Sequence, residues 1–265
     1  MKEITLIYFS PTQTTRTVLE EIAKGMGKKV AKVVDITLPA TRFQLAPKFE
    51  NEIVLMGAPV YSGRIPKDAA DYFKTLQADH TPVVPVVVYG NREFDDALLE
   101  LTDIAQDCGF DPMAASAFVG EHSFSSTEFP TALNRPDAQD LEQAFAFGKK
   151  IAEHLETGKA PGALKVPGNH PYKQGMGKGA FAFIDVSDDC DDCGVCVTAC
   201  PKEAVDETKG YATIDDRCIF CCACIKACPQ NARSLKEGPM KDKAKWLNEN
   251  CSTRKDPQIF FPEIA

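Results

Sequence analysis

The sequence predicts a doubly wound α/β unit with a five-stranded parallel sheet, followed by a small α+β unit that is rich in cysteine. Apolar runs of strand length alternate with helix-like stretches over residues 1–157, which is typical of a parallel sheet covered on both faces. Residues 158–180 are rich in Gly, Pro and Lys and show no helical or strand periodicity of hydrophobic residues, which indicates a linker. Cysteines then recur at short, fixed spacing from residue 190 onward.

The strands of the first unit are expected where β-branched apolar residues run almost without interruption, because strands of a parallel sheet are buried on both faces. These runs are EITLIYF (3–9), KVAKVVDI (29–36), EIVLMG (52–57), VVPVVVYG (83–90) and MAASAFVG (113–120). Helices are expected at residues 14–27, 66–77, 93–109 and 136–158. Ligands of such sheets bind beyond the carboxyl ends of the strands, so the loops that follow the strands are the candidate site.

The domain boundaries follow from the changes of composition. The sheet unit is expected at 1–157, the linker at 158–180, the cysteine unit at 181–236 and a tail at 237–265. We expect the linker to be exposed, with few core contacts across it. The tail holds one predicted helix around MKDKAKWLNEN (240–250) and an extended end.

Composition and charge limit the classes of partner. The chain has 265 residues, of which 44% are hydrophobic, and a formal net charge of −8. This charge argues against a nucleic-acid partner and favours redox proteins with a basic surface. No apolar run approaches the roughly 20 residues that a membrane span needs. The N-terminal MKEITLIYFSPT is interpreted as a strand and not as a signal peptide, so a cytoplasmic protein is expected.

Two cysteine runs share the pattern C-x2-C-x2-C-x3-C-P and form an internal duplication with a 28-residue step. The short gaps let a tight loop wrap three thiolates around one iron–sulfur cube, and the fourth cysteine, before the proline, ligates the other cluster. The runs therefore predict two [4Fe-4S] clusters and resemble the bacterial two-cluster ferredoxins. The first cysteine set is Cys190, Cys193, Cys196 and Cys228, and the second cysteine set is Cys218, Cys221, Cys224 and Cys200.

Structural zinc and disulfides are the alternatives for these cysteines. Zinc sites usually separate their C-x2-C pairs by a longer loop, and disulfides are rare in a reducing compartment. Cys222 lies between two predicted ligands and is expected to be structural.

The loop SPTQTT (10–15) connects the first strand to the first helix. A hydroxyl-rich loop at a helix N-terminus favours a phosphate, because free backbone N–H groups and the helix dipole both attract an anion. The alternative is that the threonines only cap the helix. The loop has neither G-x-x-x-x-G-K-[ST] nor G-x-G-x-x-G, which disfavours triphosphate hydrolysis and a dinucleotide site.

Two further loops, GAPVYSGRIP (57–66) and YGNREFDD (89–96), follow the third and fourth strands. With SPTQTT they resemble the flavodoxin family, and the resemblance implies a flavodoxin-like fold that binds FMN. It implies phosphate contacts from Ser10, Thr12, Gln13, Thr14 and Thr15, although the family has glycine in place of Gln13. It implies flavin contacts from Pro59, Val60, Tyr61, Ser62, Gly63, Gly90, Asn91 and Arg92, with Tyr61 against the ring and Gly63 tuning the one-electron state.

Taken together with GEHSFS (120–125), the two halves resemble the flavodoxin–ferredoxin fusions of the EFR1 type. The predicted function is that of an electron carrier between redox partners, in which FMN pairs or splits the single electrons of two clusters. The alternative is a flavin-dependent reductase of a small-molecule acceptor, with a pocket built by Glu121, His122, Arg92 and Arg64. A third hypothesis is a scaffold that only senses redox state. No catalytic residue and no oligomeric state are predicted.

Overall fold

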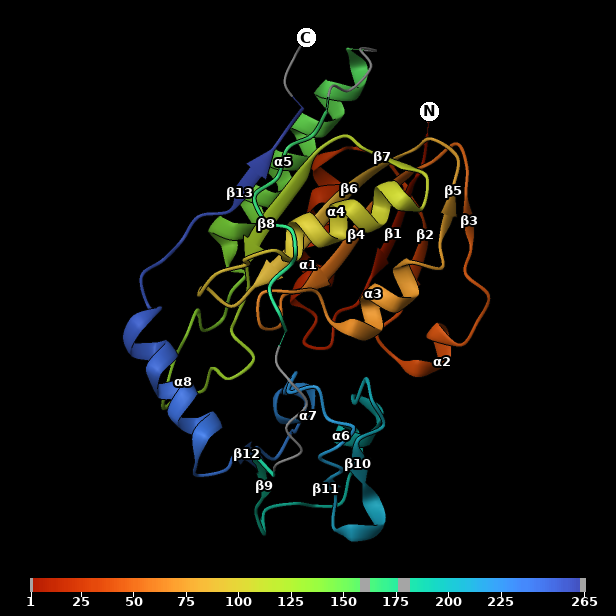
Figure 1. Ribbon diagram of the computed structural model, residues 1–265. Helices are drawn as coiled ribbons and strands as arrows, with labels where there is room; N and C mark the ends of the chain where they lie inside the picture. Colours follow the sequence, from red (N-terminus) through yellow and green to blue (C-terminus); the bar gives the residue numbers. More distant parts are fainter. Residues whose placement is uncertain (1, 158–162, 176–181, 263–265) are drawn as a thin grey trace.

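The computed structural model describes residues 2–157, 163–175 and 182–262. Figure 1 shows two parts, a layered α/β part coloured red to green and a smaller part that carries the clustered cysteines and lies at one end of the sheet. None of the helices in these ranges has the length and apolar character that crossing a bilayer requires.

The main sheet contains seven strands. In spatial order they are β2 (Val30–Asp35), β1 (Ile4–Tyr8), β4 (Ile53–Pro59), β6 (Thr81–Tyr89), β8 (Ala115–Val119) and β13 (Gln258–Phe260), with β7 (Phe110–Pro112) paired to β6. All of these pairs are parallel except that of β13 with β8. The five long parallel strands follow the order 2-1-3-4-5 along the sheet, which is the flavodoxin-like order. The predicted fold class is confirmed.

Helices cover both faces of this sheet (Figure 1). They are α1 (Thr14–Gly25), α3 (Lys67–Phe73), α4 (Ala97–Asp107) and α5 (Ala138–Glu156). Alternate residues of each strand face opposite layers, so Leu6 packs with α1 and α5 whereas Ile7 packs with α3 and α4. The four predicted helices are present. Helix α4 begins later than expected, because the backbone of Asp95 is left-handed, with φ 45°.

Short elements complete the two parts. The sheet part also contains α2 (Pro39–Arg42), β3 (Lys48–Phe49) and β5 (Gln77–Ala78). The cysteine part contains β9 (Ile184–Val186), α6 (Val195–Thr198), β10 (Val205–Asp206), η1 (Glu207–Lys209), β11 (Ala212–Thr213), α7 (Ala223–Lys226) and β12 (Arg233–Leu235). Strand β9 pairs with β12, and β10 pairs with β11.

The internal duplication is visible in the backbone of the cysteine part. Helix α6 is preceded by Gly194 with φ 72°, and α7 by Cys222 with φ 56°. The two residues are 28 positions apart, the step of the duplication. Cys222 therefore occupies the turn that glycine occupies in the first repeat, and it is fully buried.

The C-terminal segment returns to the main sheet. The helix expected in the tail is α8 (Pro239–Asn250). The extended end that follows is β13, which pairs with the edge strand β8 and places Ile259 opposite Ser116. The cysteine part is therefore connected to the sheet part on both sides, through α8 and β13 after it and through residues 163–175, here called the strap, before it (Figure 1).

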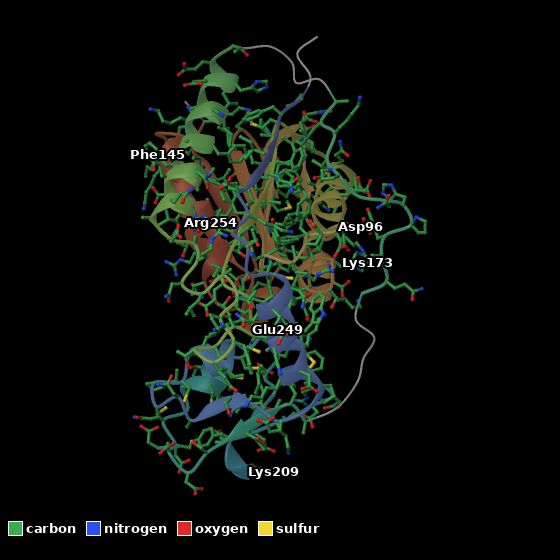
Figure 2. The ribbon with its side chains drawn as sticks, turned by 90° about the vertical axis from the view of Figure 1, so that its left-hand side faces the viewer. Asp96, Phe145, Lys173, Lys209, Glu249 and Arg254 are labelled. Atoms are coloured by element: carbon green, nitrogen blue, oxygen red, sulfur yellow. The ribbon has the colours of Figure 1, made fainter. Side chains whose placement is uncertain are left out.

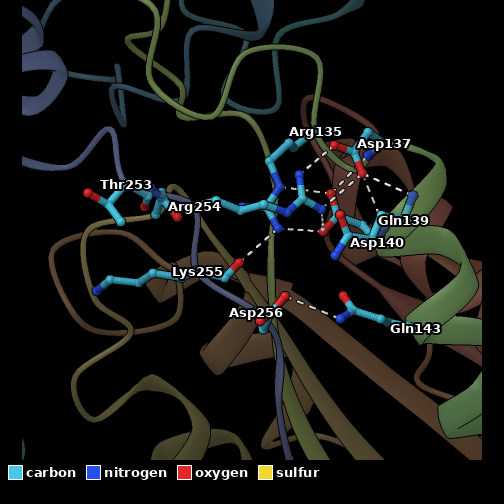
Figure 3. A network of polar contacts seen from close by, with 10 residues as sticks. Arg135, Asp137, Gln139, Asp140, Gln143, Thr253, Arg254, Lys255 and Asp256 are labelled. Carbon is cyan, nitrogen blue, oxygen red and sulfur yellow. Dashed lines mark hydrogen bonds and ion pairs between the residues drawn. The ribbon is translucent and has the colours of Figure 1, made fainter.

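An ion-pair network fastens this returning segment to the start of α5 (Figure 3). The side chains of Arg135 and Asp140 are 5% and 1% exposed and pair with each other. Arg254 donates to Asp140 at 3.0 Å and to Asp137 at 2.6 Å, and Arg135 donates to the carbonyl of Lys255 at 2.9 Å. Asp137 and Asp140 also form the capping box of α5. The C-terminal segment is thus built into the structure of the first unit.

The strap is packed against the sheet part. The carboxylate of the buried Asp96 accepts the backbone N–H groups of Lys173, at 2.6 Å, and Asn169, at 2.9 Å (Figure 2). Leu164 and Val166 pack against the core on the α3 and α4 side. The expectation that few core contacts cross the linker is therefore wrong for the strap. The rest of the predicted linker lies outside the described residues.

Candidate functional site

The two parts meet at the end of the sheet where the loops after β1, β4 and β6 lie (Figure 1). Arg42 donates to the carbonyl of Pro201 at 2.6 Å, and Lys202 pairs with Asp68 at 2.6 Å. Pro201 and Lys202 directly follow Cys200 in the sequence. A predicted cluster ligand is therefore held next to the carboxyl ends of the strands.

A second group of contacts lies at the other side of this junction. Lys226 of α7 pairs with Glu121 and donates to the carbonyl of Ser125 at 2.6 Å. Ile219 packs against the core of the sheet part, and Phe124 against that of the cysteine part. Sequence reasoning did not anticipate the polar contacts at this junction, because they join residues 101 to 159 positions apart and leave no local signal.

The loop after β1 enters α1 through a left-handed residue, Gln13, with φ 64°. The hydroxyl of Ser10 accepts the N–H of Arg16 at 3.1 Å. The hydroxyl of Thr15 is buried and has no hydrogen-bond partner among the described residues. The first turn of α1 carries no acidic residue. A buried, unpartnered hydroxyl at the positive end of a helix fits a bound phosphate.

The threonine-capping alternative is wrong for this loop. Thr14 and Thr15 lie inside α1, and the N-cap residue is Gln13, whose side chain makes no capping bond. Both the backbone N–H and the side-chain amide of Gln13 donate to the carbonyl of Ser10, each at 3.1 Å. Gln13 therefore closes the turn. Thr12 and Thr14 are half-buried in the same turn.

Replacing Gln13 with glycine is expected to raise the free energy of unfolding by about 1 kcal/mol, because a left-handed backbone strains a residue that has a Cβ. Urea unfolding measures the change. Gln13→Ala keeps the Cβ and is the matched control, which should give no gain. A loss of stability in Gln13→Gly would mean that the side-chain bond to Ser10 outweighs the strain.

The loop after β4 is a two-residue hairpin. Tyr61 and Arg64 exchange backbone hydrogen bonds of 2.8 and 3.2 Å, and Ser62 and Gly63 between them have φ values of 56° and 83°. Such a turn strongly favours glycine. A Cβ on Gly63 would also lie 2.5 Å from a carboxylate oxygen of Asp95.

The carbonyl of Gly63 accepts the N–H of Asp96 at 3.1 Å. A reorientation that carried this carbonyl towards a flavin would give up that bond. Tuning of the flavin by Gly63 stays a prediction. Pro59 ends β4 and Val60 packs against the core, so the hairpin has a rigid base.

Tyr61 is half-buried in the loop after β4. Burial raises the pKa of Tyr61 well above its ordinary value, and the neighbouring thiols of Cys221, Cys222 and Cys218 raise it further. One side chain of a predicted flavin loop is therefore close enough to three cysteines of the other part to interact with them electrostatically.

The loop after β6 is held by the C-terminal segment. The side-chain amide of Asn91 donates to the carbonyls of Cys251 and Thr253, at 2.6 and 2.8 Å, while its oxygen is buried without a partner in the described part of the chain. Gly90 leaves room for His122, whose ring a Cβ there would meet at 2.3 Å. The loop is thus ordered and keeps one free polar atom.

His122 is a neutral side chain in this setting. Burial lowers its pKa to about 4, and the nearby charges of Lys226, Lys243 and Arg92 lower it further. Its Nδ1 accepts the backbone N–H of Phe124 at 3.0 Å, which leaves the ring proton on Nε2.

The second cysteine set surrounds a pocket. Its four members, Cys200, Cys218, Cys221 and Cys224, all line this pocket, as does Cys222. Cys200 comes from the first run and the other three from the second, so the geometry fits the crossed ligand set. Burial raises the pKa of Cys218 to about 11. Four cysteine side chains around one space fit a metal core, which would hold them as thiolates.

The first cysteine set has three members near one another. Burial raises the pKa of Cys196, and the neighbouring thiols of Cys190 and Cys228 raise it further. Cys193 is exposed, and its N–H is bonded to Asp191 at 3.3 Å. In the described ranges, no three or more His, Cys, Asp or Glu side chains are arranged to hold a single metal ion.

One family model matches part of this chain. Residues 211–234 match the model described as a 4Fe-4S binding domain. The matched range contains the whole second cysteine run and supports at least one [4Fe-4S] cluster. The chain therefore joins a flavodoxin-like fold to a 4Fe-4S binding region, as an iron–sulfur redox protein. None of the curated proteins matches it.

Solved structures of flavodoxins are similar to the sheet part. A flavodoxin from the domain Archaea is 14% identical, covers 58% of this chain and 99% of its own, and has a TM-score of 0.39. A short-chain flavodoxin associated with a non-canonical PDU bacterial microcompartment is 13% identical over 60% of this chain and 100% of its own, with a TM-score of 0.41. The flavodoxin of Streptococcus pneumonia TIGR4 is 16% identical, covers 57% of this chain and 97% of its own, and has a TM-score of 0.40. The fold assignment rests on the strand order.

Proposed function

We propose that the chain is an electron-transfer protein in which FMN, bound at the loops after β1, β4 and β6, exchanges electrons with two [4Fe-4S] clusters. The observation that carries the proposal is the junction itself. Lys202 and Pro201, which follow Cys200, are held at the strand ends by Asp68 and Arg42, each at 2.6 Å. The predicted flavin contact Tyr61 interacts electrostatically with Cys218, Cys221 and Cys222. A flavin against Tyr61 and a cluster in the second cysteine set would be near neighbours. Membership of the EFR1-type fusions is part of the same proposal.

Each cofactor has a set of residues that fits it. When bound, FMN supplies one- and two-electron chemistry and each cluster supplies one-electron chemistry. The hydroxyl of Thr15 and the first turn of α1 would hold the phosphate. The free oxygen of Asn91 and the ring of Tyr61 would hold the flavin, and the crossed cysteine sets would hold the clusters.

The arrangement supports an order of transfer. The second cysteine set lies at the junction of the two parts, whereas the first cysteine set has an exposed member, Cys193. Electrons would pass between FMN and the second cluster, then the first cluster, then an external redox protein. Exposed aspartates beside Cys193, among them Asp191 and Asp192, favour a partner with a basic surface. Such thiolate sites require a reducing compartment, which agrees with a cytoplasmic location.

The reductase alternative has less support from the same region. Arg64 pairs with Glu100, Arg92 with Asp95 and Glu121 with Lys226. His122 is neutral, and its Nδ1 is engaged. The side chains that would build a substrate pocket over the flavin are thus committed to protein partners, which favours the carrier.

The first test is composition. Anaerobically purified protein should contain about one FMN and about eight irons with matching sulfide per chain, as the two-cluster pattern requires. After flash reduction of the clusters, the flavin should be reduced at a rate that does not change on dilution. Absence of flavin, or a rate proportional to protein concentration, would contradict the proposal. A flavin that stays inert to reduced clusters would favour the redox-sensing scaffold.

The junction offers a matched pair of variants. Asp68→Lys puts two lysines together where Asp68 now pairs with Lys202 at 2.6 Å, and should slow internal transfer several-fold, because like charges repel and loosen the docking. Asp71→Lys makes the same charge change on the same helix, where the ion pair of Asp71 within the described part of the chain is with Lys67. It should leave the rate unchanged. Equal rates for both variants would show that the Asp68 contact does not hold the parts in their transferring geometry.

A further inference from the structure

A buried arginine lies between the two cysteine sets. Arg233 opens β12 and is 3% exposed. Its Nη1 lies 4.0 Å from the sulfur of Cys196, in the first cysteine set. In the second cysteine set, the side chain of Arg233 also forms a hydrogen bond with Cys224. One guanidinium therefore acts on a member of each set.

The described polar contacts of Arg233 include no carboxylate. Its Nη1 donates to the carbonyl of Tyr211 at 2.6 Å, and its Nη2 to the hydroxyl of Thr213 at 3.0 Å. Its Nε is buried and has no partner among the described residues. A buried cation without a counter-charge is strongly unfavourable, so a negative group has to compensate it. Among the described residues that interact with Arg233, Cys196 and Cys224 have sulfurs that can become negative.

The fold of the repeat does not itself require an arginine at this place. The duplication has a step of 28 residues, so the position in the first repeat that corresponds to Arg233 is Val205. Val205 is 7% exposed and belongs to the apolar core of the cysteine part, which also contains Cys196 and Cys224. The first repeat thus has an apolar side chain at this position, whereas the second repeat has a cation that interacts with a member of each cysteine set.

We propose that Arg233 is the shared counter-charge of the two clusters and makes the reduction of both more favourable. The proposal rests on the assignment of one cluster to each cysteine set. A cluster held by four thiolates gains one further negative charge when it takes up an electron. A fixed cation in a medium of low dielectric constant stabilises the reduced form more than the oxidised form. Net charge and hydrogen bonds to the sulfurs are the features that set cluster potentials.

The test is a redox titration of the whole chain with dithionite and mediators, in which both clusters are followed by electron paramagnetic resonance. Arg233→Gln removes the charge and keeps a donor amide. It should shift the ratio of reduced to oxidised cluster at least tenfold towards the oxidised form for both clusters, which is 59 mV per tenfold change for one electron. Arg233→Lys keeps the charge and should shift each ratio by less than Arg233→Gln does.

Arg217→Gln is the matched control, because Arg217 is an exposed arginine directly before Cys218. Water screens its charge, so both ratios should change less than in Arg233→Gln. Unchanged potentials in an Arg233→Gln protein with full iron content would overturn the proposal, and a shift in only one cluster would overturn the sharing. If Arg233→Gln assembles no clusters, the result for Arg233→Lys is used to test the proposal. Cluster potentials close to those of the wild type in Arg233→Lys support the proposal, and a tenfold shift in the ratio of reduced to oxidised cluster overturns it. A wild-type chain without two clusters would instead overturn the cluster assignment, and this proposal with it.

Discussion

Replacing Cys200 with alanine is expected to remove the second cluster and leave the first. Cys200 belongs to the first cysteine run, yet it lines one pocket with Cys218, Cys221 and Cys224 of the second run. Its sulfur also accepts the backbone N–H of Ala204 at 3.2 Å, a contact typical of a ligand sulfur. Iron content should fall from about eight to about four per chain. Iron analysis and electron paramagnetic resonance of the variant measure this loss.

Double variants decide whether the ligation is crossed. If Cys200 and Cys218 hold the same cluster, Cys200→Ala with Cys218→Ala should retain about four irons, as each single variant does. Cys200→Ala with Cys190→Ala should lose both clusters. Uncrossed ligation requires the reverse result. Retained iron also shows that the single variants still fold, since the part folds around its clusters.

Cys222 supplies the control for this experiment. It lines the same pocket and is fully buried, but it occupies the left-handed turn that Gly194 occupies in the first repeat. Cys222→Ala should therefore keep about eight irons. An iron loss equal to that of Cys200→Ala would contradict the ligand set of the second cluster.

Replacing Asp140 with asparagine is expected to lower the free energy of unfolding by about 3–5 kcal/mol, the typical result of breaking a buried ion pair. Asp140 is the carboxylate that the buried Arg135 faces, and it also accepts a bond from Arg254 (Figure 3). Without it, the guanidinium of Arg135 stays buried with no charge opposite. Urea unfolding of the whole chain measures the change.

Asp137→Asn is the matched control for this variant. Asp137 pairs with the same Arg254, but its side chain is 41% exposed, so its ion pair should contribute only about 0–1 kcal/mol. Asparagine also caps a helix as well as aspartate does, so the capping bond is kept. Equal losses of unfolding free energy in the two variants would show that the buried ion pair contributes no more to stability than the exposed one. A larger loss in Asp140→Asn would also show that the C-terminal segment stabilises the sheet part.

Local patterns were sufficient to predict the sheet, its helices and the cysteine runs. Runs such as VVPVVVYG are short, apolar and β-branched and lie between helix-like stretches, which favours strands buried on both faces. The loop residues of the candidate flavin site were predicted from the resemblance to flavodoxins and from the rule that such sheets bind ligands at the ends of their strands, and they stay a prediction. The pairing of Tyr61 with the second cysteine set was not found, because it joins residues of two separate parts.

The errors of the sequence reading have the same origin. The strap contains Gly and Pro and keeps no period, so it resembled a free linker, but Asp96 binds two of its backbone N–H groups. The extended end predicted for the tail is present as β13, but its pairing with β8 was not predicted, because no local pattern identifies the partner of a strand. Contacts of this kind depend on where a distant segment lies.

The sequence by itself determined the strand and helix periods and the spacing of the cysteines, because these properties are encoded within a few neighbouring residues. Only the tertiary structure decided which cysteine set lies next to the loops of the sheet and which residue lies between the two sets. Arg233 shows the physical reason. Arg233 belongs to no sequence motif. Its neighbours come together only when β12 and both cysteine runs fold around the same buried space, where a buried charge needs a charge of opposite sign.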